Sequence, residues 1–370
     1  MSKKETSPDG VPNLRDQILG QEDVFRQLDQ ARAAGRLSHA FLFTGRSGSG
    51  KTRTAIALAQ GLLCSPEDIP GRKKVARLVH SDLHFVFPQI KDETKDPSRV
   101  QALLQAYAKD LYSTLGSSDT ATIGIDQVRS LKERVAMAPV EGERRVVIWS
   151  QAHRMTEPAA QSCLKLIEEP PENTTLILCA DDTAQVLPTL VSRCQQVRIR
   201  PLSLQTLREH AEAEGSRGAE ARLVSALARG SLHRLMTLLD AGVTEARDQA
   251  LQLFTVAKPS AIAQRVESVS RRWDASAAHL TVELLLMWYH DVLWLQAGLP
   301  RDGLVHSDRV PQLTQQAGEL DPLEIRRRLA ILEQLVVAVD QYVNPSLALQ
   351  AALSQLAGRE DLVDLAFLSV

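Results

Sequence analysis

One glycine-rich segment constrains this chain more than any other feature of its sequence. Residues 45–52 read GRSGSGKT and fit the pattern G-x-x-x-x-G-K-[ST]. In this pattern the glycines let backbone N–H groups curl around phosphate oxygens, and the following helix turns its positive end toward them. An apolar run at 40–44 precedes the segment and a helical pattern at 53–63 follows it. The context therefore predicts a nucleotide-binding fold; a glycine-rich turn that only caps a helix is the alternative.

The expected ligand of this loop is ATP or ADP with Mg²⁺. Lys51 is expected to reach the β- and γ-phosphates, and the hydroxyl of Thr52 is expected to ligate the magnesium ion. The predicted nucleotide contacts are Gly45, Ser47, Gly48, Ser49, Gly50, Lys51 and Thr52.

The alternation of short apolar runs with helix-length segments continues to about residue 200. Further β-like runs lie at 146–149, 175–179 and 197–200, and helical patterns between them include 126–138 and 158–169. Apolar strands that alternate with helices are typical of a parallel sheet covered on both faces.

After residue 203 the pattern is helical to the end of the sequence. We predict an α/β P-loop domain at 1–200, a small helical domain at 201–245 and an all-helical C-terminal domain at 246–370. A polar stretch at about 89–122 is interpreted as an insertion in the first domain. It is either a solvated elaboration or a contact for a partner.

Composition narrows the class of protein. The 370 residues imply two or three domains, and 43 basic against 45 acidic residues argue against a surface built wholly for nucleic acid. Four cysteines without a C-x-x-C pair predict neither disulfides nor zinc. Residues 1–10 lack the apolar core of a signal peptide, and charges interrupt the most apolar stretch, 282–299, which predicts a buried helix. We expect a soluble cytoplasmic protein with no membrane partner.

A P-loop does not by itself make an ATPase. Hydrolysis needs a carboxylate at the end of a neighbouring strand to hold Mg²⁺, and usually a second one to activate water. After the second β-like run the chain has Ser150 and Gln151, which carry no charge. The sequence therefore favours a loop that binds nucleotide without hydrolysing it. Compensation by Asp181, Asp182 or Glu157 is the alternative.

Six segments carry a family resemblance. They are ILGQ at 18–21, LSHA at 37–40, IGIDQVR at 123–129, LKLIEEPP at 164–171, LVSRC at 190–194 and NPSLAL at 344–349. In this order the chain resembles, over almost its whole length, the AAA+ clamp-loader subunits of bacterial DNA polymerase III. The resemblance implies a P-loop domain, a helical lid and a collar. Through the collar, subunits that include gamma/tau and delta types form a pentameric ring, which places the sliding clamp on primed DNA.

The resemblance also implies roles for single residues. The arginine of the Ser-Arg-Cys motif acts as an arginine finger in trans, so Arg193 is expected to reach the ATP of a neighbouring subunit. A surface ion pair is the alternative for this residue. An arginine of the lid touches the γ-phosphate in this family; Arg234 is the expected contact, and His233 competes for that position.

Two departures separate the chain from the motor subunits of the family. Gamma/tau-type subunits carry an Asp-Glu pair where this chain has Ser150 and Gln151, and many relatives hold zinc through four cysteines where only Cys64 remains. We therefore predict an assembly subunit that does not hydrolyse ATP and has no zinc site. The alternatives are a hydrolysing gamma/tau-type motor and, more remotely, a small-molecule phosphotransferase.

Three further features receive a structural interpretation. His80, Asp82 and His84 alternate and could share a metal on one face of a strand, but a similar segment is a structural strand in the family. The aromatic residues of 288–294 are expected in the core of the C-terminal domain or at an interface rather than in a base-stacking platform. The arginines at 326–328 are expected on a solvated helix face, with contact to DNA phosphates as the alternative.

Overall fold

The computed structural model describes residues 13–90, 97–109, 120–254, 262–269, 273–341 and 343–357. The chain divides into two compact units, one of Met1–Leu207 with Arg229–Arg234 and one of Arg208–Ala228 with Leu235–Val370. The division into three domains with boundaries at 200 and 245 remains a prediction.

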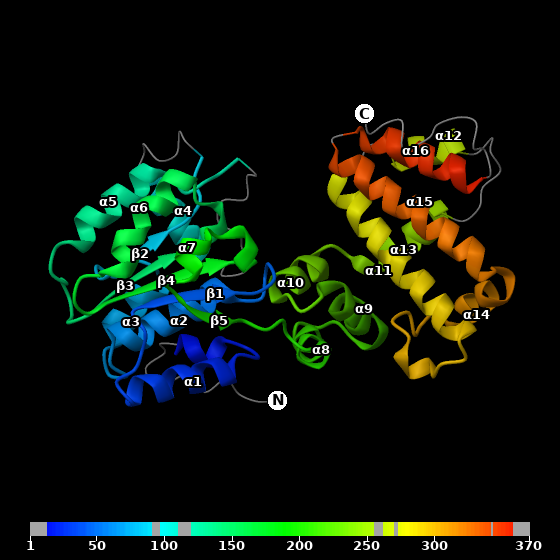
Figure 1. Ribbon diagram of the computed structural model, residues 1–370. Helices are drawn as coiled ribbons and strands as arrows, with labels where there is room; N and C mark the ends of the chain where they lie inside the picture. Colours follow the sequence, from blue (N-terminus) through cyan, green and yellow to red (C-terminus); the bar gives the residue numbers. More distant parts are fainter. Residues whose placement is uncertain are drawn as a thin grey trace. The chain divides into compact units, whose positions relative to one another are not determined.

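The first unit is built on a five-stranded parallel sheet with strand order β2-β3-β4-β1-β5 (Figure 1). Its strands are β1 (Ala40–Thr44), β2 (Leu83–Val86), β3 (Arg145–Trp149), β4 (Thr174–Ala180) and β5 (Gln195–Arg198). The predicted α/β parallel sheet is confirmed. The last strand begins two residues before its predicted position, because it is an edge strand whose exposed residues give no continuous apolar run.

Successive side chains of the strands point to opposite faces of the sheet, and both faces are covered. Phe41 and Phe43 pack on one face with α1 (Glu22–Ala33), α2 (Lys51–Leu63), α3 (Ile69–Ala76) and α4 (Pro97–Lys109). Leu42 and Trp149 pack on the other face with α5 (Ile125–Val135), α6 (Glu157–Glu168) and α7 (Pro188–Val191). The near-continuous apolar runs of the inner strands follow from this double burial.

The ends of the predicted insertion lie side by side. Gln89 and Thr122 form an antiparallel bridge in which each N–H donates to the other's carbonyl, at 3.0 and 3.1 Å. Between them, α4 carries Tyr107 into the core, where its ring lies 6.0 Å from that of Phe85. This helix is therefore more than a solvated elaboration; residues 91–96 and 110–119 lie outside the described part of the chain.

The described residues of the second unit are helical and contain no strand. Its helices are the C-terminal part of α8 (Leu204–Ala213), α9 (Gly218–Ala228), most of α10 (Leu232–Asp240), α11 (Val243–Phe254), α12 (Ile262–Val269), α13 (Ala275–Gln296), α14 (Val310–Glu319), α15 (Pro322–Asp340) and α16 (Pro345–Leu356). None of the helices in the described residues combines the length and apolarity needed to cross a bilayer.

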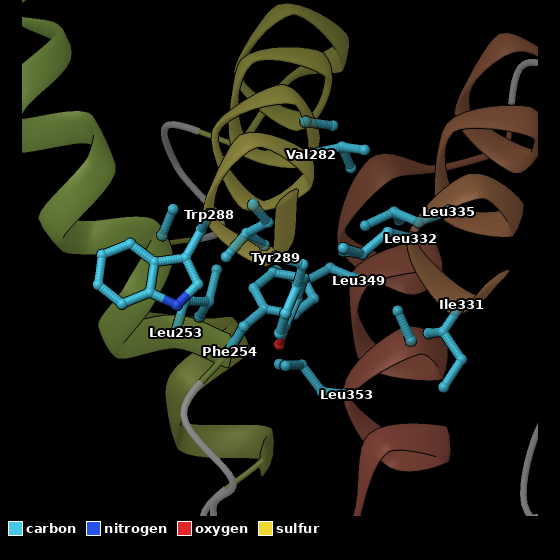
Figure 2. Packing of buried hydrophobic residues seen from close by; sticks show 14 of the residues in the cluster. Leu253, Phe254, Val282, Trp288, Tyr289, Ile331, Leu332, Leu335, Leu349 and Leu353 are labelled. Atoms are coloured by element: carbon cyan, nitrogen blue, oxygen red, sulfur yellow. The ribbon is translucent and has the colours of Figure 1, made fainter. Parts of the chain in front are cut away.

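Helix α13 supplies much of the core of the second unit. Trp288 and Tyr289 are 2% and 4% exposed and belong to the same buried cluster as Leu335 and Leu349 of α15 and α16. Figure 2 shows Trp288 on the side of α11 and Tyr289 toward α16. The prediction that these aromatic residues belong to the core, and that the apolar stretch is a buried helix, is confirmed.

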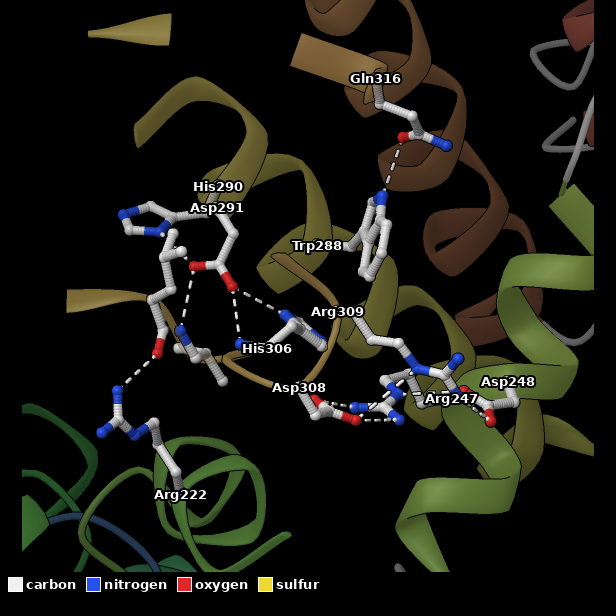
Figure 3. A network of polar contacts seen from close by, with 12 residues as sticks. Arg222, Arg247, Asp248, Trp288, His290, Asp291, His306, Asp308, Arg309 and Gln316 are labelled. Atoms are coloured by element: carbon white, nitrogen blue, oxygen red, sulfur yellow. Dashed lines mark hydrogen bonds and ion pairs between the residues drawn. The ribbon is translucent and has the colours of Figure 1, made fainter. Parts of the chain in front are cut away.

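Buried polar contacts fasten the loop between α13 and α14 to its neighbours (Figure 3). Asp291 accepts hydrogen bonds from the backbone N–H of His306 at 2.8 Å and of Val305 at 3.2 Å, and lies 2.9 Å from His306 Nδ1. Burial alone would raise the pKa of Asp291, but the hydrogen bonds from His306 lower it below its usual value. Arg247, which is 1% exposed, donates from Nη1 to Asp308 Oδ1 at 2.9 Å, and its Nη2 lies 2.8 Å from Asp308 Oδ2 in the same ion pair.

Candidate nucleotide-binding site

The predicted phosphate-binding loop connects the end of β1 to the start of α2. Gly50 precedes the helix with φ +90° and Gly48 has φ +74°, a backbone conformation that residues with a Cβ atom rarely adopt. A Cβ atom on Gly48 would also lie 1.9 Å from Ser231 Oγ. The glycine pattern is therefore required by the backbone of the loop and by the segment that packs on it.

Lys51 is folded back onto the loop. Its ammonium group donates to the carbonyl oxygens of Gly45 at 2.8 Å and Arg46 at 2.9 Å and to Asp181 Oδ1 at 2.7 Å. An ammonium group has three N–H donors, so these acceptors satisfy all of them. The lysine side chain is only 9% exposed, and the ion pair lies at the carboxyl end of the sheet.

The strand end where a hydrolysing site needs a carboxylate carries a hydroxyl group. Ser150 follows β3 directly, and its Oγ lies 3.3 Å from Thr52 Oγ1. The structure thus places Ser150 beside the expected magnesium ligand, as the sequence predicted. Gln151, the next residue, has φ +55° and leads into the 3₁₀ helix η3 (Ala152–Arg154). Two hydroxyl groups without a carboxylate are a poor set of ligands for Mg²⁺ unless phosphate oxygens complete it.

Asp181 is held in place by its neighbours as well as by Lys51. It directly follows β4, whose last residue Ala180 pairs with Thr44 at the start of the loop. The backbone N–H of Asp181 donates to Nδ1 of His153 at 3.4 Å. Burial lowers the pKa of His153 and outweighs the charge of Asp181, which raises it, so the imidazole is neutral at pH 7 and can accept this hydrogen bond.

The loop fits a phosphate-bearing ligand. Ser49 Oγ is buried and has no hydrogen-bond partner among the residues that the structure describes. The N-terminus of α2 offers backbone N–H groups at the same place, and Lys51 supplies a positive charge. A bound phosphate would accept hydrogen bonds from Ser49 Oγ and from these backbone N–H groups. Ser49, the backbone of the loop and Lys51 are therefore the residues that would hold the nucleotide, and Thr52 would meet its magnesium ion.

Arg193 lies just after the short helix α7, and its side chain is 37% exposed. Its guanidinium pairs with the carboxylate of Glu168 at the end of α6 and donates to the carbonyl oxygen of Thr189 at 2.9 Å. In the isolated chain this residue thus makes the surface ion pair that the sequence left as its alternative. Whether it also acts as an arginine finger stays a prediction.

The segment expected to contact the γ-phosphate packs on the loop. Ser231 Oγ accepts a hydrogen bond from Arg234 N at 3.1 Å, and His233 Cβ lies 3.7 Å from the position of a Cβ atom on Gly48. The structure brings Ser231 and His233 to the loop. The choice between His233 and Arg234 as the phosphate contact stays open.

Other candidate ligands are structural or scattered. Asp82 precedes β2 rather than lying on it, and its carboxylate accepts three backbone hydrogen bonds, the shortest from Val140 N at 2.6 Å. The prediction that it alternates on a strand with His80 is wrong because the strand begins at Leu83. In the described ranges no group of three or more His, Cys, Asp or Glu side chains could hold a metal ion. Burial raises the pKa of Cys64 to about 12, so its thiol stays protonated at pH 7.

One interaction of the site was missed at the level of sequence. The sequence offers Asp181 only as a substitute for the absent carboxylate and does not predict its ion pair with Lys51. The available signal was its place directly after a buried parallel strand, because the carboxyl ends of parallel strands meet at one edge of a sheet.

Comparison with known proteins connects this fold to one family. The family model described as "DNA polymerase III, delta subunit" matches residues 20–203. The chain is 25% identical over 329 residues to the DNA polymerase III subunit delta' of Bacillus subtilis, which covers 85% of this chain and 89% of that protein. It is 29% identical over 293 residues to the gamma/tau subunit of Mycobacterium bovis, covering 74% of this chain but only 46% of the relative.

Two further similarities lie in the same group. The delta' subunit of Haemophilus influenzae is 30% identical over 239 residues, which are 63% of this chain and 64% of that protein. A solved structure of a DNA polymerase III gamma subunit-related protein from Thermotoga maritima is 18% identical and has a TM-score of 0.45. The match covers 90% of this chain and 99% of that protein.

The P-loop, the parallel sheet and the helices that follow define a protein of the AAA+ class. Within that class, the chain belongs to the delta-prime family of clamp-loader subunits of DNA polymerase III.

Proposed function

We propose that this clamp-loader subunit binds ATP or ADP without hydrolysing it and completes the ATP site of a neighbouring subunit with Arg193. The similarity to delta' and gamma/tau subunits supports a place in the clamp loader of DNA polymerase III. The proposed lack of hydrolysis and the proposed role of Arg193 are argued from residues of this chain.

The observation that carries the proposal is an intact P-loop beside a strand end without a carboxylate. Ser150 Oγ takes the place next to Thr52 where a motor subunit would present an acidic ligand. A serine hydroxyl holds Mg²⁺ less well than a carboxylate does, and neither Ser150 nor Gln151 can act as a general base for water. Nucleotide bound in this loop therefore stabilises the fold and the ring, and it is not hydrolysed to drive clamp loading.

Arg193 has the features that a residue acting in trans requires. It carries a permanent positive charge, lies in the turn just after the short helix α7 and is more than one-third exposed. Its present partner, Glu168, is itself 45% exposed, so their ion pair contributes little to stability. The triply charged end of a neighbour's ATP can compete with a single solvated carboxylate for the guanidinium.

The proposed partners follow from the family. They are gamma/tau-type and delta-type subunits in a pentameric ring, the sliding clamp, and primed DNA as the substrate of the whole assembly, in the cytoplasm. The helical second unit is the proposed collar.

The test is nucleotide binding and turnover by the purified chain with Mg²⁺. Wild type is compared with Lys51→Ala, and the exposed Lys73→Ala on α3 serves as the matched control. We expect saturable binding that Lys51→Ala weakens by about tenfold or more, no turnover above background, and unchanged behaviour of Lys73→Ala.

A hydrolysing gamma/tau-type motor is the second candidate. The observation in its favour is the carboxylate of Asp181, which lies next to the loop and could stand in for the missing acid. Steady turnover by the isolated chain that disappears in Lys51→Ala would establish this function instead.

A further inference from the structure

The pairing of Lys51 with Asp181 has a consequence for which nucleotide the loop accepts. A P-loop lysine binds the terminal phosphates of the nucleotide. Here Lys51 Nζ already donates one of its three hydrogen bonds to Asp181 Oδ1, at 2.7 Å. In the described residues, the side chain of Asp181 has Lys51 as its one hydrogen-bonding partner and ion-pair partner. Among the described residues, therefore, no second cation contacts Asp181 and neutralises its charge.

The position of this carboxylate is fixed by the sheet. Asp181 follows β4, and the register pairs Ala180 with Thr44, the last residue before the loop. His153 accepts the backbone N–H of Asp181 and, being neutral, adds no charge there. These contacts hold the backbone of Asp181 at the edge of the loop, and the ion pair with Lys51 holds its partly exposed carboxylate beside the lysine.

We infer that Asp181 makes this loop selective for a nucleoside diphosphate over the corresponding triphosphate. The inference rests on the proposed nucleotide binding and deepens it. Phosphates bound by the loop amides are common to both ligands. The additional γ-phosphate of the triphosphate adds negative charge next to Asp181 and must share the same ammonium group with it, and like charges that close to each other repel.

The same contact explains why the site suits a subunit that does not turn over ATP. A loop that has a carboxylate beside its lysine would be occupied mainly by the diphosphate, which has no γ-phosphoryl group to hydrolyse. The selectivity is a property of one side chain, so one substitution should remove it.

The experiment measures dissociation constants of ADP and of a non-hydrolysable ATP analogue for the full chain with Mg²⁺, by calorimetry. Wild type is compared with Asp181→Asn, which keeps the size of the side chain and removes its charge. Asp182→Asn is the matched control, because this neighbouring carboxylate accepts from Ala184 N at 3.0 Å in the cap of η4 (Thr183–Gln185) and does not contact Lys51. Thermal unfolding of each variant checks that it is folded.

We expect wild type to bind ADP at least about tenfold more tightly than the triphosphate analogue, a ratio that corresponds to about 1.4 kcal/mol. Asp181→Asn should reduce that ratio by about tenfold, through tighter binding of the triphosphate, and Asp182→Asn should leave it within about twofold. Equal affinities for the two nucleotides in wild type, or a ratio that Asp181→Asn does not change, would overturn the inference but leave nucleotide binding intact. Loss of triphosphate binding in Asp181→Asn only when Mg²⁺ is present would assign Asp181 to the metal and also overturn it. Failure of every variant to bind either nucleotide would refute the proposed binding function itself.

Discussion

Replacing Gly48 by alanine tests whether the phosphate-binding loop and the segment around Ser231 form one structure. The φ angle of +74° costs an alanine about 1–2 kcal/mol. The new Cβ atom would also lie 1.9 Å from Ser231 Oγ, so Ser231 must move. Its hydrogen bond from Arg234 N then breaks, which costs about 1 kcal/mol as the loss of a helix cap. We expect Gly48→Ala to destabilise the chain by about 2–3 kcal/mol in total.

The assay is urea unfolding of the full chain, followed by circular dichroism, with nucleotide affinity measured in parallel. Gly61→Ala is the control: this glycine lies in α2, has open space where its Cβ atom would be, and should gain about 1 kcal/mol from the higher helix propensity of alanine. In the double variant Gly48→Ala with Ser231→Gly the clash is removed, but the hydroxyl cap is lost as well, and glycine in the cap position costs only a few tenths of a kcal/mol relative to serine. The double variant should therefore be less destabilised than the sum of the two single variants. Wild-type stability of Gly48→Ala, or strictly additive effects of the two substitutions, would refute the packing described for this loop.

Three further predictions concern ion pairs. Asp308→Asn should destabilise the chain by about 1–2 kcal/mol in urea unfolding, because it leaves the buried Arg247 with the partly exposed Asp248 as its remaining charged partner; a loss below about 0.5 kcal/mol would contradict this. Glu168→Gln should change stability by less than about 1 kcal/mol, because both members of its pair with Arg193 are more than one-third exposed; a larger loss would make that pair structural. The pKa values of Asp291 and Asp308 are lowered in the folded chain, so the two carboxylates contribute fully to stability above about pH 4, and this contribution disappears as the pH falls through the folded pKa values. The free energy of unfolding, measured from pH 7 to pH 3, should begin to fall below about pH 4. A free energy of unfolding that stays constant down to pH 3 would contradict this prediction.

The parallel sheet could be predicted where burial leaves a mark in the sequence. Strands β1, β3 and β4 are covered on both faces and therefore read as continuous apolar runs. Strands β2 and β5 lie at the two edges of the sheet. Their residues are partly exposed, so β2 was not among the predicted apolar runs and β5 was placed two residues too late.

The loop itself was predictable because its glycines are needed locally, but the contacts that tune it were not. Lys51 and Asp181 are 130 residues apart, and only the register between β1 and β4 brings them together. Arg193 and Glu168 both lie in recognised motifs, yet their pairing depends on how α6 and α7 pack. Local pattern thus predicts which groups are present, and tertiary packing decides which of them meet.

The most direct measurement of the central claim is the DNA-stimulated ATPase rate of the clamp loader reconstituted with this subunit and its gamma/tau-type and delta-type partners. Arg193→Ala is compared with wild type, with Arg193→Lys, which keeps the charge but not the planar guanidinium, and with the exposed Arg26→Ala of α1 as control. We predict that Arg193→Ala assembles normally and lowers the rate by about a hundredfold or more, with Arg193→Lys close to it and Arg26→Ala unchanged. A complex with Arg193→Ala that hydrolyses ATP at the wild-type rate would contradict the role proposed for this subunit.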